Sequence, residues 1–209
     1  MKKTNTTRTI GTSTIIKMFA VLLFFFTPLM ADDFSSTVRV HRQSGASFSG
    51  TVIEVENGKT LVLTCGHGFF TLKKQPTGVS FYNKDGETSY PAKLLKQHRI
   101  WDLALIEINQ ELKVDVAAFA DKMPQNYSKL SATGYHYFDK QKHYFTLVEK
   151  GWTTTDGELL FTANGKAVNG LSGASIRDKN NSIIAVQSGG TPHMINGARL
   201  ETIIKFLSQ

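Results

Sequence analysis

Short apolar segments of strand length alternate with turn-forming residues along most of the chain. The segments TVRVH, SGTVIEVE, TLVLTCGH, DLALIEI, YFTLVEKGW and SIIAVQSG are separated by Gly, Asn, Asp and Pro. Short apolar runs at this spacing are typical of a β-barrel or a β-sandwich. The pattern therefore predicts a protein built mostly of β-strands.

Two dipeptides predict tight hairpins in the first half of the chain. Asn57-Gly58 separates TVIEV from TLVLT, and Asp85-Gly86 separates VSFYN from SYPAKLL. Asn-Gly and Asp-Gly favour two-residue turns, because these residues tolerate positive φ. Residues 109–127 have no clean period and contain Pro124, so we interpret them as the crossing between two halves, with a boundary near residue 118.

The periodicity changes at the C-terminal end. In NGARLETIIKFLSQ, apolar residues fall at the spacing of one helix face, namely Leu200, Ile203, Ile204 and Leu207. This spacing predicts a short terminal helix that packs on the second half.

The first 31 residues have the pattern of an export signal. Basic residues accompany the apolar core MFAVLLFFFTPLMA; they are Lys2, Lys3, Arg8 and Lys17. A membrane-spanning helix needs about 20 apolar residues, and this run is shorter and contains Pro28, so a retained anchor is the weaker interpretation. We expect cleavage near Ala31, a secreted or periplasmic protein of residues 32–209, and no stable membrane insertion afterwards.

Charge and cysteine content narrow the function classes. The formal charge of the whole chain is +7, and removal of the four basic residues of the signal leaves +3. A nucleic-acid-binding domain normally carries a basic stripe, which residues 32–209 lack, so we expect no nucleic-acid partner.

Cys65 is the only cysteine. The fold is therefore expected to be one domain held by burial without an internal disulfide.

Three stretches place a reactive side chain beside a predicted strand. They are LVLTCGHGF with His67, HRIWDLALIEI with Asp102, and NGLSGASI with Ser172. A serine hydroxyl becomes a useful nucleophile when an imidazole takes its proton and a carboxylate orients that imidazole. Each residue alone has a simpler explanation, as a strand-end histidine, a strand-start aspartate or a turn serine. Their joint presence in this order favours a catalytic set.

The surrounding motifs resemble those of the trypsin-like (chymotrypsin-fold) serine peptidases, especially the compact bacterial type similar to the HtrA protease domain. Thr64-Cys65-Gly66-His67 resembles T-[AN]-A-H, and Asp102-Leu103-Ala104-Leu105 resembles D-[LIV]-A-L. Gly170-Leu171-Ser172-Gly173-Ala174 resembles G-[DN]-S-G-G. The resemblance covers nearly all of residues 32–209.

This resemblance implies a fold and a reaction. The expected fold is all-β, with two six-stranded antiparallel β-barrels at about residues 34–118 and 119–209 and a short C-terminal helix. The expected activity is that of an exported serine endopeptidase that hydrolyses polypeptides through an acyl-enzyme and needs no cofactor or metal. His67 is then the general base, Asp102 its orienting carboxylate and Ser172 the nucleophile. The backbone N–H groups of Gly170 and Ser172 form the oxyanion hole.

The resemblance also implies substrate contacts. Ser188, Gly189 and Gly190 follow the strand IIAVQ, where relatives pair with the substrate backbone. Lys166 lies six residues before Ser172, at the base of the primary specificity pocket in relatives, and the resemblance there implies a preference for an acidic P1 side chain. The ordinary explanation for Lys166 is an exposed residue on a turn.

Several residues depart from the family pattern. Leu171 replaces the usual Asp or Asn, and Ala174 and Ser175 replace Gly-Pro. Activation through a buried new N-terminal amine therefore cannot be assumed. These departures leave an alternative function open, a catalytically silent member of the fold that binds peptides or partner proteins. The oligomeric state is not predicted.

Cys65 invites a different chemistry. Thiolate and imidazole are both nucleophilic partners and metal ligands, and Cys65 stands two residues before His67. However, one Cys-x-His pair supplies at most two ligands, and the other histidines, at positions 41, 98, 136, 143 and 193, have no matching spacing. The favoured interpretation of Cys65 is a small buried apolar residue.

Overall fold

The structure is a computed structural model, and it describes residues 36–42, 44–70, 77–83, 86–124, 129–136, 142–155 and 158–209. The predicted signal peptide, residues 1–31, and the turn residue Asp85 lie outside the described residues. Within the described part, no helix is both long enough and apolar enough to cross a membrane.

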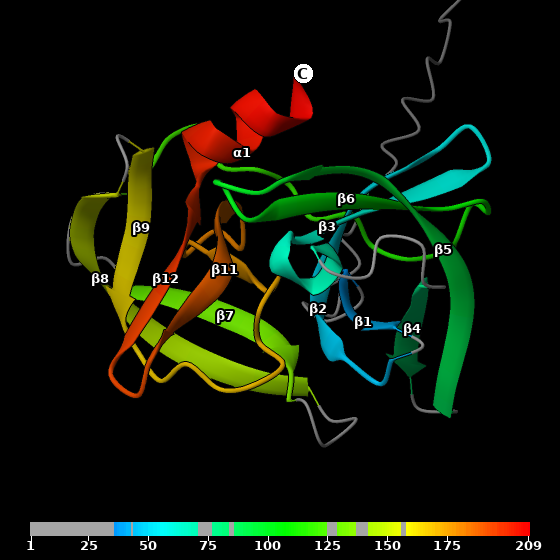
Figure 1. Cartoon of the computed structure of the whole chain (residues 1–209), viewed down its shortest axis with the longest axis horizontal. Helices are drawn as coiled ribbons and strands as arrows, with labels where there is room; N and C mark the ends of the chain where they lie inside the picture. Colours follow the sequence, from blue (N-terminus) through cyan, green and yellow to red (C-terminus); the bar gives the residue numbers. More distant parts are fainter. Residues whose placement is uncertain are drawn as a thin grey trace, which may run out of the picture.

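The first half of the chain forms a closed antiparallel barrel of six strands (Figure 1). Its strand order is β1-β2-β3-β6-β5-β4. The strands are β1 (Thr37–Arg42), β2 (Ser47–Glu56), β3 (Lys59–Cys65), β4 (Thr77–Asn83), β5 (Gly86–His98) and β6 (Leu103–Ile108). β2 and β3 meet at the predicted hairpin, where Asn57 and Gly58 have φ values of 52° and 76°. The positive φ at both positions explains the Asn-Gly pair.

The second half forms another closed antiparallel barrel of six strands, with the order β10-β11-β12-β9-β8-β7. The strands are β7 (Lys129–Tyr135), β8 (Lys142–Thr155), β9 (Glu158–Asn164), β10 (Ser175–Arg177), β11 (Ile183–Thr191) and β12 (Met194–Arg199). The helix α1 (Leu200–Leu207) follows directly. The all-β fold of two six-stranded barrels with a short C-terminal helix is thus confirmed.

The barrels are joined by an apolar layer that includes the helix. This layer contains residues of β3, β6, β11, β12 and α1; its buried members are Leu63, Trp101, Leu103, Ala117, Ile183, Val186, Ala198, Ile203 and Phe206. Each barrel also has its own core cluster. Because this shared layer is close-packed, it fixes the position of one barrel relative to the other. Figure 1 shows the two barrels side by side with α1 above their junction.

Candidate functional site

His67 and Asp102 are brought together by the register of two neighbouring strands. β3 ends at Cys65 and pairs with β6 so that Cys65 lies opposite Leu103. His67 opens a short 3-10 helix, His67–Phe69, just after β3, and Asp102 stands just before β6 with φ 51°. The Nδ1 atom of His67 lies 2.8 Å from Asp102 Oδ2. The backbone N–H of His67 donates to Asp102 Oδ1 at 2.5 Å.

The electrostatics of this pair favour the protonated imidazole. The hydrogen bond to Asp102, and next the one to Cys65, raise the pKa of His67 to about 10, against the lowering effect of burial. The His67 side chain is 42% exposed and that of Asp102 is 18% exposed. Asp102 therefore both orients the ring through Nδ1 and stabilises its positive charge.

Cys65 is a buried neighbour of the imidazole. It is fully buried in the core of the first barrel, and its Sγ lies 3.7 Å from His67 Nε2. Nε2 is the atom that would accept the proton of a nucleophile. In this conformation its neighbour is the Cys65 sulfur. No group of three or more His, Cys, Asp or Glu side chains that could hold a metal ion occurs in the described ranges.

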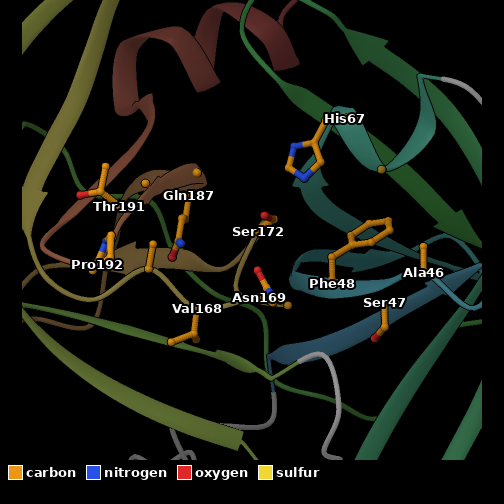
Figure 2. A pocket seen from close by; sticks show the side chains of 15 residues that line it. Ala46, Ser47, Phe48, His67, Val168, Asn169, Ser172, Gln187, Thr191 and Pro192 are labelled. Carbon is orange, nitrogen blue, oxygen red and sulfur yellow. The ribbon is translucent and has the colours of Figure 1, made fainter.

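Ser172 comes from the other barrel and lines the same cleft as His67 (Figure 2). Its hydroxyl donates to the Ser188 carbonyl oxygen at 3.4 Å, which is a long hydrogen bond. No hydrogen bond joins Ser172 to His67 in the described part of the chain. In structures without substrate, catalytic hydrogen bonds are often long and tighten when the substrate binds.

The loop around Ser172 presents backbone donors to the cleft. Gly170 and Gly173 have φ values of 98° and 87°, which favour glycine. The N–H of Leu171 donates to the Val168 oxygen. Within the described residues, the N–H groups of Gly170 and Ser172 have no hydrogen-bond partner, and both residues line the cleft. These two donors are therefore available to a bound oxyanion.

The departures from the family pattern serve as core residues. Leu171 and Ala174 are fully buried in the core cluster of the second barrel. Ser175 is also fully buried and begins β10. Apolar packing of Leu171 in the core of the second barrel consequently holds the loop, at a position where relatives have a polar residue.

The cleft has a volume of about 640 Å³ and is bordered by both barrels. Gly189 and Gly190 line it, and Ser188 contributes the carbonyl that meets Ser172. Lys166 is exposed and is not among the lining residues. The N–H groups on either side of it, at Gly165 and Ala167, donate to His193 and Thr191 of the β11–β12 turn. Every predicted site residue except Lys166 thus either lines the cleft or, like Asp102 and Ser188, is hydrogen-bonded to a residue that lines it.

Gln187 is a cleft residue that the sequence analysis did not single out. Its side chain comes from β11 and points into the cleft in Figure 2. It is only 1% exposed, and its Oε1 atom has no hydrogen-bond partner among the described residues. One signal for it is visible in QSGG, where a polar residue stands directly before the predicted substrate-binding segment.

One comparison identifies the family of the chain, and another identifies its fold. The model of the trypsin-like peptidase domain matches residues 48–186. No curated protein matches the chain. Among solved structures, the active form of the Rv3671c protease from M. tuberculosis has a TM-score of 0.70 and 15% identity, over 87% of this chain and 83% of that one.

Two further solved structures are similar. Deg5 has a TM-score of 0.67 and 15% identity, over 82% of this chain and 87% of that one. The serine endoprotease from Yersinia pestis has a TM-score of 0.68 and 14% identity, over 84% of this chain and 62% of that one. At these identities the likeness establishes the fold alone.

Proposed function

Because the chain belongs to the family of the trypsin-like peptidase domain, we propose that it is a serine endopeptidase in which Ser172 is the nucleophile. The observation that carries this proposal is the His67–Asp102 pair, which faces the same cleft as Ser172 and the two unpartnered N–H groups beside it. A base, its orienting acid, a nucleophile and an oxyanion site are the parts that acyl transfer needs.

The reaction proceeds in two halves. In the first, Ser172 Oγ attacks the scissile carbonyl while its proton passes to His67 Nε2, which turns from Cys65 toward the hydroxyl. The developing oxyanion accepts hydrogen bonds from the N–H groups of Gly170 and Ser172. His67 then gives the proton to the leaving amine as the C–N bond breaks. In the second half, water attacks the acyl-enzyme, with His67 again as base, and releases the acid and Ser172.

An extended peptide fits the free edge of β11. Ile183 to Val186 pair with β10 or β12, whereas Gly189 and Gly190 pair with β12 alone. An extended substrate can add hydrogen bonds along Ser188, Gly189 and Gly190 as a further strand. We therefore propose unfolded or extended polypeptides as the substrate class.

We predict that the P1 side chain is uncharged and polar. A buried carboxamide oxygen without a partner costs about 1–3 kcal/mol, so a substrate donor that bonds to Gln187 Oε1 relieves this cost. Among the described residues, none of those that line the cleft is Asp, Glu, Lys or Arg. A peptide library should show preference for Ser, Thr, Asn or Gln at P1, and Gln187→Leu should reduce that preference about tenfold or more.

The same library distinguishes the role of Lys166. A preference for Asp or Glu at P1 that disappears in Lys166→Ala would contradict the assignment to Gln187 and support Lys166 instead. If Lys166→Ala has the wild-type profile, Lys166 is a solvated turn residue.

Hydrolysis of unfolded casein tests the proposed function as a whole. Purified residues 32–209 should release peptides, and prior treatment with a fluorophosphonate should abolish this. One observation favours the alternative of a silent, peptide-binding protein: Nε2 of His67 contacts Cys65 and not Ser172. Peptide binding without hydrolysis between pH 7 and 10 would establish that alternative.

We also propose export. It rests on the basic residues and the apolar core within residues 1–31. N-terminal sequencing of the protein recovered from an exporting bacterial host should begin near Asp32. A chain that stays in the cell with Met1 intact would refute it.

A further inference from the structure

Ser49 is a buried residue of the first barrel that bonds to the nucleophile loop of the second. It lies on β2 and is fully buried. Its N–H donates to the Ser172 carbonyl oxygen at 2.8 Å. Its hydroxyl donates to the Gly170 carbonyl oxygen, also at 2.8 Å. One residue thus holds the carbonyl groups on both sides of Leu171.

These bonds fix two peptide planes of the loop. The Gly170–Leu171 peptide is held by Ser49 at its oxygen and by the Val168 oxygen at its N–H. The Ser172–Gly173 peptide is held by Ser49 at its oxygen and by the Gln187 oxygen at its N–H, at 2.7 Å. The unpartnered N–H groups of Gly170 and Ser172 each lie in the peptide unit that directly precedes one of these two held units. Fixing the two planes therefore restricts the directions in which the two free N–H groups point.

The Ser49 hydroxyl is itself held in place. The N–H of Tyr135 donates to Ser49 Oγ at 2.9 Å, so this oxygen accepts one hydrogen bond and donates another. Hydrogen bonds in such a chain polarise one another and strengthen. The path runs from β7 through Ser49 to the Gly170 carbonyl, and it joins the two barrels at the loop.

The close approach of Ser49 also explains a glycine. A Cβ atom at Gly173 would lie 2.1 Å from the Ser49 carbonyl oxygen and 2.3 Å from Thr64 Oγ1. Thr64 Oγ1 in turn donates to the Ser49 oxygen at 2.6 Å, and Thr64 is three residues before His67. Ser49 consequently lies between the strand that leads to the base and the loop that carries the nucleophile.

We propose that Ser49 is a positioning residue whose hydroxyl pre-orients the oxyanion-binding N–H groups of Gly170 and Ser172. Together with the buried side chain of Leu171, it holds the loop through neutral contacts. The kinetic consequence rests on the proposed peptidase function, whereas the effect on loop order does not.

Ser49→Ala tests this role, with Thr51→Val as the matched control. Thr51 is two residues away on the same strand and equally buried, but its hydroxyl has no partner in the described structure. In Ser49→Ala we expect kcat to fall about 10–100-fold with KM unchanged, because oxyanion contacts act in the transition state. Thr51→Val should match the wild type. An equal fall in both variants, or a rise in KM alone, would overturn the proposal.

Amide hydrogen exchange of the loop provides a readout that does not need activity. In Ser49→Ala, the N–H groups of Leu171, Gly173 and Ala174 should exchange at least about tenfold faster, while Thr51→Val leaves them unchanged. Ser49→Cys, which keeps a weak donor, serves if Ser49→Ala does not fold, and should show intermediate exchange. An inactive wild type would refute the proposed function. Exchange that is unaltered by loss of the Ser49 hydroxyl would refute its positioning role.

Discussion

Replacement of Ser172 by alanine is expected to lower kcat for peptide hydrolysis at least about 10,000-fold, with KM close to that of the wild type. The substitution removes the atom that forms the acyl bond but leaves the cleft lining and the two N–H donors in place. Residual rate, if any, arises from substrate binding and the oxyanion site. Steady-state kinetics on a fluorogenic peptide measures both constants.

Ser44→Ala is the control for this variant. Ser44 is an exposed serine on the loop between β1 and β2, and its loss should leave kcat within about twofold of the wild type. Equal hydrolysis by the wild type and by Ser172→Ala would show that another residue, or a contaminating protease, carries the activity.

Asp102→Asn is expected to change the pH dependence of hydrolysis as well as its rate. The imidazole must be neutral to act as base, and with a pKa of about 10 only about one ring in a thousand is neutral at pH 7. The rate of the wild type should therefore rise with pH up to about pH 10. Asn in place of Asp102 removes the main cause of the raised pKa, so its rate should level off at lower pH.

The ratio of the wild-type rate to the Asp102→Asn rate should consequently grow with pH. When the imidazole is neutral in both proteins, loss of the orienting carboxylate lowers kcat about 10,000-fold. At pH 7 the larger neutral fraction in the variant offsets most of this loss, which leaves a ratio of about tenfold. Near pH 10 the ratio should approach 10,000-fold, as about half of the wild-type rings are neutral there. A constant ratio from pH 6 to 10 would contradict the raised pKa.

Cys65→Ala is the matched variant for this experiment. It removes the second cause of the raised pKa but keeps the bonds between His67 and Asp102. The midpoint of the pH profile should move to lower pH, while the plateau rate stays near that of the wild type. A large fall in the plateau rate would instead give Cys65 a direct part in catalysis.

Stability should change with pH in the opposite direction from activity. The folded-state pKa of His67 is raised above its ordinary value of 6.5, so protonation favours the folded state. This contribution is fully present below about pH 6.5 and is lost as the pH rises through about 10. Urea unfolding of the wild type and Asp102→Asn across this range should show the difference in their free energies of unfolding shrinking with increasing pH.

The fold was predictable because it depends on local patterns. Alternation in segments such as TVRVH and DLALIEI matches the burial of β1 and β6, which both alternate between core and partly exposed positions. The turn at Asn57 and Gly58 follows from the need for positive φ. The helix α1 follows from its spacing, and Leu200 and Ile203 are buried as predicted. Ile204 was predicted on the same face but is 47% exposed, and Phe206 is buried in its place.

Contacts between distant residues were not predictable in this way. Ser49 and Gly170 are 121 positions apart, and their bond exists only because the two barrels pack in one arrangement. Cys65 Sγ and His67 Nε2 lie 3.7 Å apart across Gly66, where a Cβ atom would meet backbone atoms of Leu103 and His98 from other segments. The spacing of Lys166 from Ser172 predicts a cleft residue, but hydrogen bonds of its two neighbours to the β11–β12 turn set the path of the chain there.

The most direct test of the account is to map the site of a fluorophosphonate adduct on the purified protein. Peptide mass spectrometry after reaction at pH 7, 8.5 and 10 should find one adduct, on Ser172, with a labelling rate that increases with pH as His67 loses its proton. Absence of any adduct at all three values, or an adduct on a residue outside the cleft, would contradict the assignment of Ser172 as the activated nucleophile.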